Sequence, residues 1–313
     1  MIDLNLIREA RERIGGIVKK TPVMTSETIS KDFGNELFFK CEHLQKTGAF
    51  KIRGASNKVI QEFQRNTKHV IAASSGNHGQ AVAYIANQLE ICSTIVVPED
   101  AAACKRDAIK AYNGNIEVCG TTSEERIERA KQISEDGKAV FIPPYDDPFI
   151  MAGQGTAGLE IVEQVDDIDE VYVPIGGGGL ISGVATAIKE SNPGIRVIGV
   201  EPAIANDTYL SFKQGKRFNI GGSITIADGL RTSIPGELTF PVVQRYVDDI
   251  VLVDEESIKK AFIYVLTRMK QVIEPSGAVS VAGAMKRNPG SKRIVALISG
   301  GNVDTDFIPK LLK

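Results

Sequence analysis

The feature that most constrains the fold of this chain is a regular alternation of short β-branched runs with segments of helical periodicity. Apolar residues recur on one helical face between the runs, as they do within residues 52–63. Because strands that alternate with helices are joined by crossover connections, this order predicts parallel sheets and the α/β class. The predicted strands are residues 37–40, 70–73, 93–97, 115–118, 170–175, 196–200 and 293–298.

The length of the chain, 313 residues, favours two domains. The segment that most clearly interrupts regular secondary structure is Pro-Pro-Tyr-Asp-Asp-Pro at 143–148. We interpret it as a crossing between domains. We expect a small domain formed by 68–145 and a large domain formed by 1–67 and 146–313. The large domain would then be discontinuous in sequence.

Composition argues against several classes of function. Lys and Arg number 37 against 39 Asp and Glu, so the chain lacks the basic excess of a general nucleic-acid binder. Charged residues recur through residues 2–20, which leaves no apolar core for a signal peptide, and no run is long and apolar enough to span a membrane. We therefore expect a cytoplasmic protein with no nucleic-acid and no membrane partner.

Cysteine and histidine usage excludes common metal and disulfide chemistry. The four cysteines form no CxxC pair, so reduced thiols are expected in place of disulfides or zinc ligands. The three histidines show no metal-binding spacing, which excludes zinc chemistry of the HExxH type.

Four consecutive glycines, at 176–179, follow a predicted strand and precede a predicted helix. Backbone N–H groups are exposed in such a loop, and the helix dipole adds positive potential, so the loop is suited to bind a phosphate. A tight turn alone would need only one or two glycines. No Lys-Ser/Thr pair follows, which excludes a Walker P-loop. The one GxGxxG sequence, at 153–158, follows no convincing strand and is weak evidence for dinucleotide binding.

A second loop, Ser-Ser-Gly-Asn-His-Gly at 74–79, also joins a predicted strand to a predicted helix. It offers a helix N-terminus together with hydroxyl and amide donors, which could hold a carboxylate. A structural cap would explain one serine and one asparagine, but hardly the whole cluster.

Lys51 is predicted to lie on the first turn of a helix, where the helix dipole disfavours a cation. Arg53 adds a second positive charge nearby, and both effects favour the neutral amine that attacks carbonyls. A lysine taken alone is more often a solvated charge. Beside a phosphate loop and a carboxylate loop, however, it completes the set of parts that a pyridoxal-phosphate enzyme needs.

The segment Lys-Thr-Gly-Ala-Phe-Lys-Ile-Arg-Gly-Ala at 46–55 resembles the Schiff-base lysine motif of fold-type II pyridoxal-phosphate enzymes. It is most similar to the serine racemase and serine/threonine dehydratase family. The segments 74–79, 176–179 and 298–302 match the same family in the same order. The resemblance implies a fold like that of the tryptophan synthase β subunit, with a mainly parallel twisted sheet flanked by helices in each domain. It also implies a mobile small domain and a homodimer.

The resemblance implies a role for each matched residue. Lys51 would carry the cofactor and remove the substrate α-proton, while Ser75 would act as an acid or base on the opposite face. The substrate carboxylate would be held by Ser74, Ser75, Gly76, Asn77 and His78. The cofactor would be bound by Phe50 on its ring, Asn77 at the phenolic oxygen, Ser299 at the pyridine nitrogen, and the phosphate loop of Gly176, Gly177, Gly178, Gly179 and Leu180. A neutral Ser299 would make the ring a weaker electron sink than an aspartate partner would, which suits β-elimination better than transamination.

Glu201 and Asp207 follow the end of a predicted strand, with Ala205 between them. Two carboxylates and a carbonyl are hard oxygen donors that suit Mg²⁺, Mn²⁺ or Ca²⁺. Acidic residues at such positions are more often ordinary surface groups. The segment resembles the cation site of serine racemases, which implies that Glu201, the Ala205 carbonyl and Asp207 are ligands.

Two segments bear on the branch of the family. Residues 273–277 resemble the racemases, whereas Tyr145 stands where animal racemases tend to carry asparagine and resembles the dehydratases. We expect a serine racemase/dehydratase that acts on L-serine, L-threonine or related 3-hydroxy amino acids, with a nucleotide effector as a further family property. The alternative is a plain L-threonine/L-serine dehydratase or a threo-3-hydroxyaspartate dehydratase.

Two rival functions on the same fold are disfavoured by the sequence, one of them from a non-catalytic class. A non-catalytic phosphate-binding or amino-acid-binding protein on the same scaffold would have lost the lysine or the glycine loop, and both are intact. A β-replacement enzyme such as a cysteine synthase is disfavoured by the motif around Lys51 and by the segment 201–207.

Overall fold

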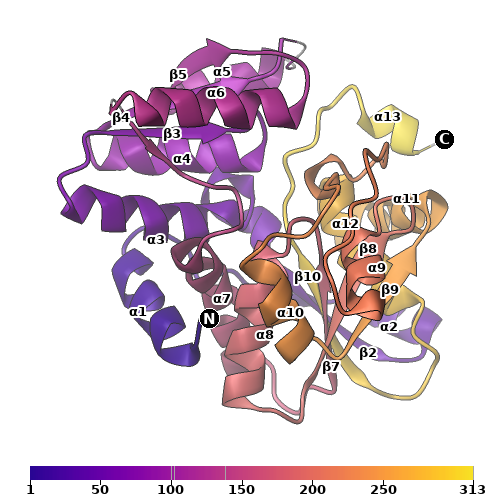
Figure 1. Cartoon of the computed structure of the whole chain (residues 1–313). Coiled ribbons are helices and arrows are strands. Elements are labelled where there is room, and N and C mark those ends of the chain that lie inside the picture. The colour runs from indigo at the N-terminus through magenta and orange to yellow at the C-terminus, as the bar shows by residue number, and fades with distance from the viewer. Residues whose placement is uncertain (100, 102, 138, 313) are drawn as a thin grey trace.

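The computed structural model describes residues 1–99, 101, 103–137 and 139–312 of the chain (Figure 1). Its strands form two separate sheets, one of six strands in the order β1-β2-β10-β7-β8-β9 and one of four in the order β5-β4-β3-β6. The four strands of the smaller sheet are consecutive in sequence, whereas the larger sheet combines strands from both ends of the chain.

The larger sheet is parallel except at one edge, where β1 pairs antiparallel with β2. Its inner strands β7, β8 and β10 are buried on both faces, as strands of parallel sheets usually are. In β10, for example, Ile294 and Ala296 enter one apolar cluster while Val295 and Leu297 enter the other. The strands are β1 (Val23–Thr25), β2 (Glu36–Cys41), β7 (Glu170–Pro174), β8 (Arg196–Pro202), β9 (Asp249–Val253) and β10 (Arg293–Ile298).

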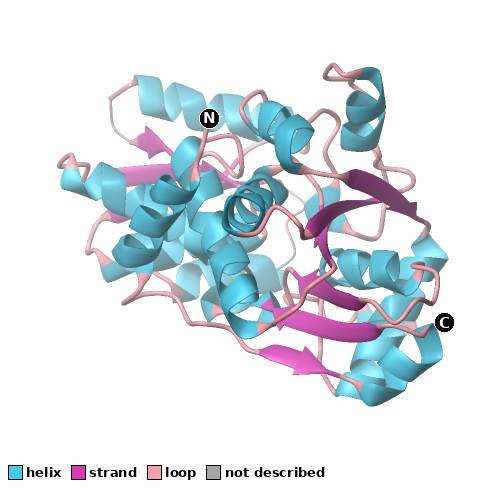
Figure 2. Cartoon of the chain, turned by 90° about the horizontal axis from the view of Figure 1, so that it is seen from below, coloured by secondary structure: helices cyan, strands magenta, loops and turns pink. Residues whose placement is uncertain are grey.

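Helices cover both faces of the larger sheet (Figure 2). One face packs against α2 (Glu27–Phe33), α11 (Glu255–Tyr264) and α12 (Pro275–Met285). The other face packs against α7 (Pro148–Gln164), α8 (Gly179–Ser191) and α10 (Thr239–Tyr246).

The smaller sheet is wholly parallel and consists of β3 (His69–Ala73), β4 (Cys92–Val97), β5 (Asn115–Val118) and β6 (Val140–Phe141). One face packs against α3 (Lys51–Gln64), α4 (Asn77–Gln88) and α5 (Ala103–Ala111). The other packs against α6 (Ser123–Glu135), which begins with a capping box formed by Thr122 and Glu125.

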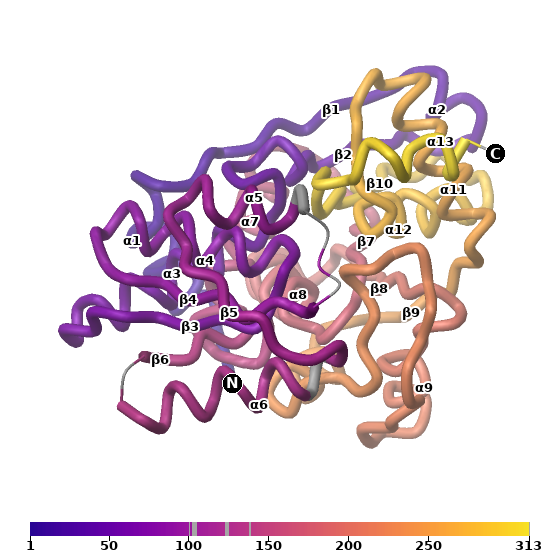
Figure 3. Tube along the Cα trace, turned by 90° about the horizontal axis from the view of Figure 1, so that it is seen from above, coloured from indigo at the N-terminus to yellow at the C-terminus, as the bar shows by residue number. Residues whose placement is uncertain are grey.

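The remaining elements lie outside the two layers of helices described above. Helix α1 (Leu4–Ile14) packs on α3, α7 and α8, and the chain then crosses to β1 and α2 at the edge of the larger sheet (Figure 3). A π-helical turn (Val265–Met269) follows α11, and α9 (Asp207–Gln214) and α13 (Ile308–Leu311) are short surface helices. Short 3-10 turns span Glu42–Leu44, Lys46–Gly48 and Asp228–Leu230. Among the described residues, no helix is long and apolar enough to cross a membrane.

The predicted α/β class is confirmed, and each of the seven predicted strands is present. The missed strands β1, β6 and β9 lie at sheet edges, and β1 and β6 have only three and two residues, too few to show a periodic pattern. The GxGxxG sequence lies inside α7, where a Cβ at Gly153 would stand 2.6 Å from the Arg53 carbonyl oxygen. These glycines therefore allow close helix packing and form no phosphate loop.

The described cysteines Cys41, Cys92 and Cys119 are free thiols, as predicted. The side chain of Cys104 lies outside the described residues.

The parallel order of the strands determines where a site can form. The carboxyl ends of β2, β10 and β7 lie at one edge of the larger sheet, where each strand leads into one of the loops singled out above. Ligands of open α/β sheets bind at this edge. The loop after β3 extends from the same end of the smaller sheet and lines the same cavity.

Candidate active site

A cavity of about 440 Å³ lies between the loops of the two sheets. This volume falls within the range of small-molecule sites, which is roughly 300–1,000 Å³. All residues predicted to bind the cofactor or the substrate line it: Phe50, Lys51, Ser74, Ser75, Gly76, Asn77, His78, Gly176, Gly177, Gly178, Gly179, Leu180 and Ser299. The fold thus joins segments far apart in sequence, since Phe50 and Ser299 share one cavity although they lie 249 residues apart.

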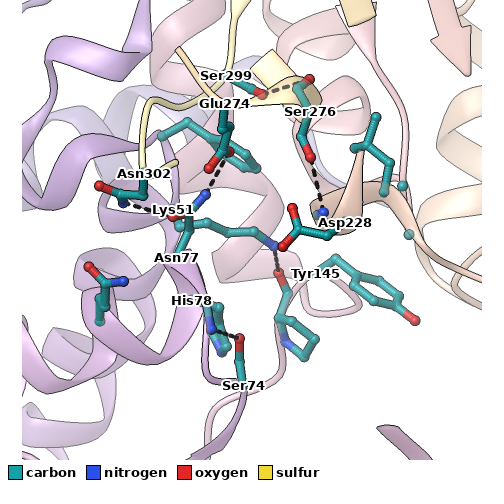
Figure 4. A pocket seen from close by; sticks show the side chains of 18 of the residues that line it. Lys51, Ser74, Asn77, His78, Tyr145, Asp228, Glu274, Ser276, Ser299 and Asn302 are labelled. Carbon is teal, nitrogen blue, oxygen red and sulfur yellow. Dashed lines mark hydrogen bonds between the residues drawn. The ribbon is translucent and has the colours of Figure 1, made fainter. Parts of the chain in front are cut away.

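Lys51 is the first residue of α3, as predicted, and its side chain extends into the cavity (Figure 4). Its Nζ donates a hydrogen bond to the carbonyl oxygen of Pro144 at 2.7 Å and lies 5.3 Å from the centre of the Phe50 ring. Burial lowers the pKa of Lys51 to about 8, while the charge of Glu274 acts in the opposite direction. A substantial share of the amine is therefore neutral near pH 8.

The prediction that Arg53 helps to lower the pKa of Lys51 is wrong. The guanidinium of Arg53 is fully buried and donates to Glu42 and to Glu160, each at 2.7 Å. Two carboxylates neutralise its charge, and Lys40 joins the cluster through Glu160. Desolvation of the amine, and not a neighbouring cation, is the main cause of the shift at Lys51.

The glycine loop joins β7 to α8 and passes close to two side chains. Gly178 has φ +92°, and a Cβ there would lie 2.7 Å from Thr239 Oγ1. A Cβ at Gly177 would lie 2.5 Å from the Tyr145 ring. No side chain caps the N-terminus of α8, so its first N–H groups can bind a phosphate, and the loop fits the phosphate of pyridoxal phosphate.

Asn77 is the first residue of α4, and its amide is held from two sides. Its Nδ2 donates to Glu274 Oε1 at 2.8 Å, and its Oδ1 accepts from Asn302 Nδ2 at 2.8 Å. No side chain caps the helix at Gly76, so the backbone N–H groups that follow can bind an anion. This arrangement fits both a carboxylate at the helix start and a contact from Asn77 to a cofactor oxygen.

His78 is buried behind this loop, with Nε2 2.9 Å from the carbonyl oxygen of Ile142. Burial, together with the charge of Lys51, lowers the pKa of His78 to about 3. The ring is therefore neutral, and its Nε2–H is donated to Ile142. Only the backbone N–H of His78 suits the predicted contact with a carboxylate, because the ring carries no charge.

Ser299 follows the end of β10 and is buried, with only 3% of its surface exposed. Its Oγ donates to the carbonyl oxygen of Ser276 over a long 3.4 Å, and its own carbonyl accepts from the Phe50 N–H at 3.0 Å. This second contact ties the strand end to the residue before Lys51. A hydroxyl with one weak partner is free to turn towards a pyridine nitrogen.

Glu274 and Asn302 also line the cavity, and sequence reasoning assigned them no role in the site. Glu274 is 6% exposed, and burial together with the charge of Asp228 raises its pKa to about 8. From the sequence, the segment 273–277 indicates only a resemblance to the racemase branch. One sequence signal could have identified Glu274. It directly precedes Pro275 and a long run of small apolar residues, and an acidic residue at the start of such a buried helix is itself buried.

Glu201 and Asp207 meet at the start of α9, and both are fully buried. Glu201 accepts from the N–H groups of Thr208 and Tyr209 at 3.1 and 2.7 Å, and Asp207 accepts from Thr232 Oγ1. Burial raises the pKa of both carboxyls, that of Glu201 well above its usual range with a contribution from Asp207, and that of Asp207 to about 6. Two buried, adjacent acids fit a divalent cation, whose charge would favour their ionised forms.

Ala205, which lies between these acids in the sequence, is also fully buried. In the described part of the chain, no group of three or more His, Cys, Asp and Glu side chains is arranged to hold a metal. A cation at this place would therefore need backbone oxygen, as the prediction with the Ala205 carbonyl supposes.

Comparison with known proteins places this geometry in a family. Residues 14–300 match PALP, the pyridoxal-phosphate dependent enzyme family. The chain is 43% identical to a serine racemase of Dictyostelium discoideum, over 99% of this chain and 98% of that protein. It is 42% identical to an L-threonine ammonia-lyase of Geobacter sulfurreducens, over 98% of this chain and 77% of that protein.

The fold also matches that of a solved structure. Maize serine racemase superposes with a TM-score of 0.93 and 42% identity, covering 99% of this chain and 97% of that one. The family match spans the lysine, both anion-binding loops and the end of β10. The chain therefore belongs to the fold-type II family of pyridoxal-phosphate dependent enzymes.

Proposed function

We propose that this enzyme acts on L-serine, L-threonine or a related 3-hydroxy amino acid. It would eliminate water and ammonia to leave a 2-oxo acid, interconvert the enantiomers of serine, or do both. The observation that carries the proposal is the Lys51 amine of lowered pKa, set in one cavity with a phosphate loop and a carboxylate loop. The similarity to a serine racemase and an L-threonine ammonia-lyase supports the substrate class.

The residues of the cavity fit pyridoxal phosphate as follows. Lys51 would carry it, the glycine loop would bind its phosphate, Asn77 its phenolic oxygen and Ser299 its pyridine nitrogen. Phe50 would pack against its ring. When bound, the cofactor supplies an electron sink that stabilises negative charge at the substrate α-carbon. The protein residues orient the substrate and move its protons.

We propose that the substrate carboxylate binds at the start of α4. The backbone N–H groups of Ser75, Gly76, Asn77 and His78 would donate to it, together with the hydroxyls of Ser74 and Ser75. No side chain caps this helix, which supports the assignment. A carboxylate held there would fix the α-carbon between Lys51 and Ser75.

Lys51 Nζ would then take the α-proton from one face of the substrate. Elimination needs only this base, because the β-hydroxyl leaves with a proton as water. Racemisation also needs a proton delivered to the opposite face, and we assign that delivery to the Ser75 hydroxyl. General acid–base groups contribute about 10²–10⁴-fold to such steps.

We propose a Mg²⁺, Mn²⁺ or Ca²⁺ ion bound by Glu201, the Ala205 carbonyl and Asp207. The burial of both acids and their raised pKa values support it, because a cation would offset the cost of ionising them. Thr232, which donates to Asp207, also lines the active-site cavity and connects the two sites.

Four further properties are proposed on the family resemblance. Residues 68–145 would move as a small domain against 1–67 and 146–313, two chains would form a homodimer, and a nucleotide would act as an effector. The enzyme would work in the cytoplasm. The separate four-stranded sheet supports the first of these.

The experiment that tests the function is incubation of the pyridoxal-phosphate-loaded enzyme with each L- and D-3-hydroxy amino acid. We expect 2-oxo acid and ammonia from L-serine or L-threonine, and D-serine from L-serine if racemisation occurs. The same assay with O-acetylserine and sulfide checks the rival β-replacement reaction. Failure to convert any hydroxy amino acid, with the cofactor bound, would contradict the proposal.

A further inference from the structure

A chain of hydrogen bonds fixes the amide of Asn77 through residues to which no part in the reaction has been assigned. Asn302 Nδ2 donates both to the carbonyl oxygen of Thr47, at 2.7 Å, and to Asn77 Oδ1, at 2.8 Å. Asn77 Nδ2 donates in turn to Glu274 Oε1 at 2.8 Å. Figure 4 shows Asn302, Asn77 and Glu274 in this order beside Lys51. The bonds join segments 197 to 255 residues apart in sequence.

The donors and acceptors along this chain allow only one direction. The Thr47 carbonyl can only accept, so Asn302 must turn its Nδ2 towards it. The same Nδ2 also faces Asn77, which must therefore accept its hydrogen bond with the side-chain oxygen Oδ1. The Nδ2 of Asn77 is thereby turned towards Glu274. The opposite orientation of Asn77 would place its N–H₂ group against the N–H₂ group of Asn302, where neither nitrogen can accept a hydrogen bond.

This direction decides what Asn77 can offer to a ligand. An amide nitrogen carries two hydrogens, and Glu274 takes one of them. The second can be donated into the cavity, which Asn77, Glu274 and Asn302 all line. An inverted amide would present its oxygen, which repels a phenolate oxygen.

We propose that Asn302 and Glu274 are positioning residues that lock the Asn77 amide so that it presents an N–H to the phenolic oxygen of the cofactor. The inference rests on the contact proposed above between Asn77 and that oxygen. Neither residue needs to touch the reacting atoms, since both act through Asn77.

Packing around the two residues supports a fixed orientation. A Cβ at Gly48 would lie 2.3 Å from Asn302 Oδ1, and a Cβ at Gly300 would lie 2.4 Å from Glu274 Oε1. Glycines at both positions let the backbone approach these side chains closely. Asn302 and Glu274 therefore have little room to adopt another rotamer.

The test compares two substitutions of Asn302. Asn302→Asp keeps the shape but removes the donor, so an oxygen faces Asn77 Oδ1 and drives the amide to invert. Asn302→Ala removes the bond without forcing inversion. We expect Asn302→Asp to raise the dissociation constant of pyridoxal phosphate about tenfold or more, and Asn302→Ala to raise it less. A role in shape or packing predicts the reverse order.

Two readouts and one matched control accompany the comparison. Equilibrium dialysis gives the dissociation constant, and absorption of the bound cofactor gives the ratio of its visible to its near-ultraviolet band, which should fall in Asn302→Asp. The control is Asn35→Asp, because buried Asn35 also donates to two carbonyls and accepts from one backbone N–H, at the opposite end of β2. It should change neither readout.

A double-mutant cycle with Asn77→Ala shows whether Asn302 acts through Asn77. In the Asn77→Ala background, Asn302→Asp should change the dissociation constant less than twofold. An undiminished effect there, or a larger effect of Asn302→Ala than of Asn302→Asp, would overturn the lock while leaving the Asn77 contact intact. If Asn77→Ala alone alters neither readout, the contact itself is wrong, and the proposed lock is wrong with it.

Glu274→Leu tests the other anchor in case Asn302→Asp does not fold. It removes the acceptor while preserving bulk, and we expect a roughly threefold to tenfold rise in the dissociation constant. The rise should vanish in the Asn77→Ala background. A rise of the same size in both backgrounds would contradict the proposal.

Discussion

Lys51 and Arg53 lie two residues apart at the start of α3, yet their surroundings differ in charge. Arg53 is fully buried and bound by Glu42 and Glu160, which raise the pKa of its guanidinium above its usual value. Among the described residues, no carboxylate lies within ion-pair distance of Lys51, and burial lowers its pKa to about 8. The charge of Arg53 is balanced by carboxylates, whereas the amine of Lys51, beside the cavity, is unbalanced because it forms no ion pair with the described residues.

The comparison shows two roles for buried charged groups: ion-paired groups stabilise the fold, and groups without an ion pair can take part in chemistry. The balanced charges of Arg53, Glu160 and Lys40 hold α3 against α7 and β2. An unbalanced amine titrates near neutral pH and can exchange protons with a substrate, as perturbed groups at functional sites do. Glu274, with its raised pKa, belongs to the unbalanced set.

Lys51→Ala should reduce turnover of hydroxy amino acids by about 10⁴-fold or more, because it removes both the cofactor anchor and the base. It should not lower the thermal stability of the cofactor-free protein, since it removes a desolvated amine. The exposed Lys68→Ala serves as control and should leave turnover unchanged. Residual turnover within tenfold of the parent would remove Lys51 from the mechanism.

Arg53→Met should lower the free energy of unfolding by about 3–5 kcal/mol, because it leaves Glu42 and Glu160 buried without their main partner. Chemical denaturation of the cofactor-free protein measures the loss. Arg53→Lys restores one charge and should recover part of it. A loss below about 1 kcal/mol would show that the cluster is not balanced as described.

Ser75→Ala should reduce D-serine formation by about 10²–10⁴-fold while elimination from L-serine falls much less. Racemisation needs an acid on the second face, and elimination does not. A raised KM for L-serine would report a contribution of the hydroxyl to carboxylate binding. Equal loss of both activities in kcat, with KM unchanged, would defeat the two-face assignment.

Chelation of divalent cations should lower the melting temperature by a few degrees, and Mg²⁺ or Mn²⁺ should restore it. Differential scanning calorimetry measures the change. Asp207→Ala should abolish the response to both chelator and metal. A variant that responds as the parent does would place the cation elsewhere.

Sequence reasoning found the parts of the site that are local motifs. Lys51, the glycine loop and the Ser74–His78 loop each occupy a strand-to-helix junction, and such junctions can be recognised from a few neighbouring residues. The α/β class followed from the same alternation. The short edge strands β1 and β6 were missed, because two or three residues carry no periodicity.

Long-range pairing could not be found in this way. The partner of Arg53 in α7 lies 107 residues away, and Glu274 and Asn302 reach Asn77 across 197 and 225 residues. No local sequence pattern shows that two carboxylates neutralise the charge of Arg53. The sequence alone therefore predicts, wrongly, that Arg53 lowers the pKa of Lys51. Only the packing of α3 against α7 reveals it.

Lys51 is an amine without a carboxylate at ion-pair distance in the described part of the chain, and we propose that it carries the cofactor. Cofactor-free protein is mixed with pyridoxal phosphate at a series of pH values, trapped briefly with borohydride, and digested for peptide mapping. The neutral amine reacts and the ammonium does not, so labelling should rise with pH through about 8. The account predicts a single labelled peptide that contains Lys51. Label on another lysine, or labelling of Lys51 that rises only near the ordinary lysine pKa of about 10.4, would contradict it.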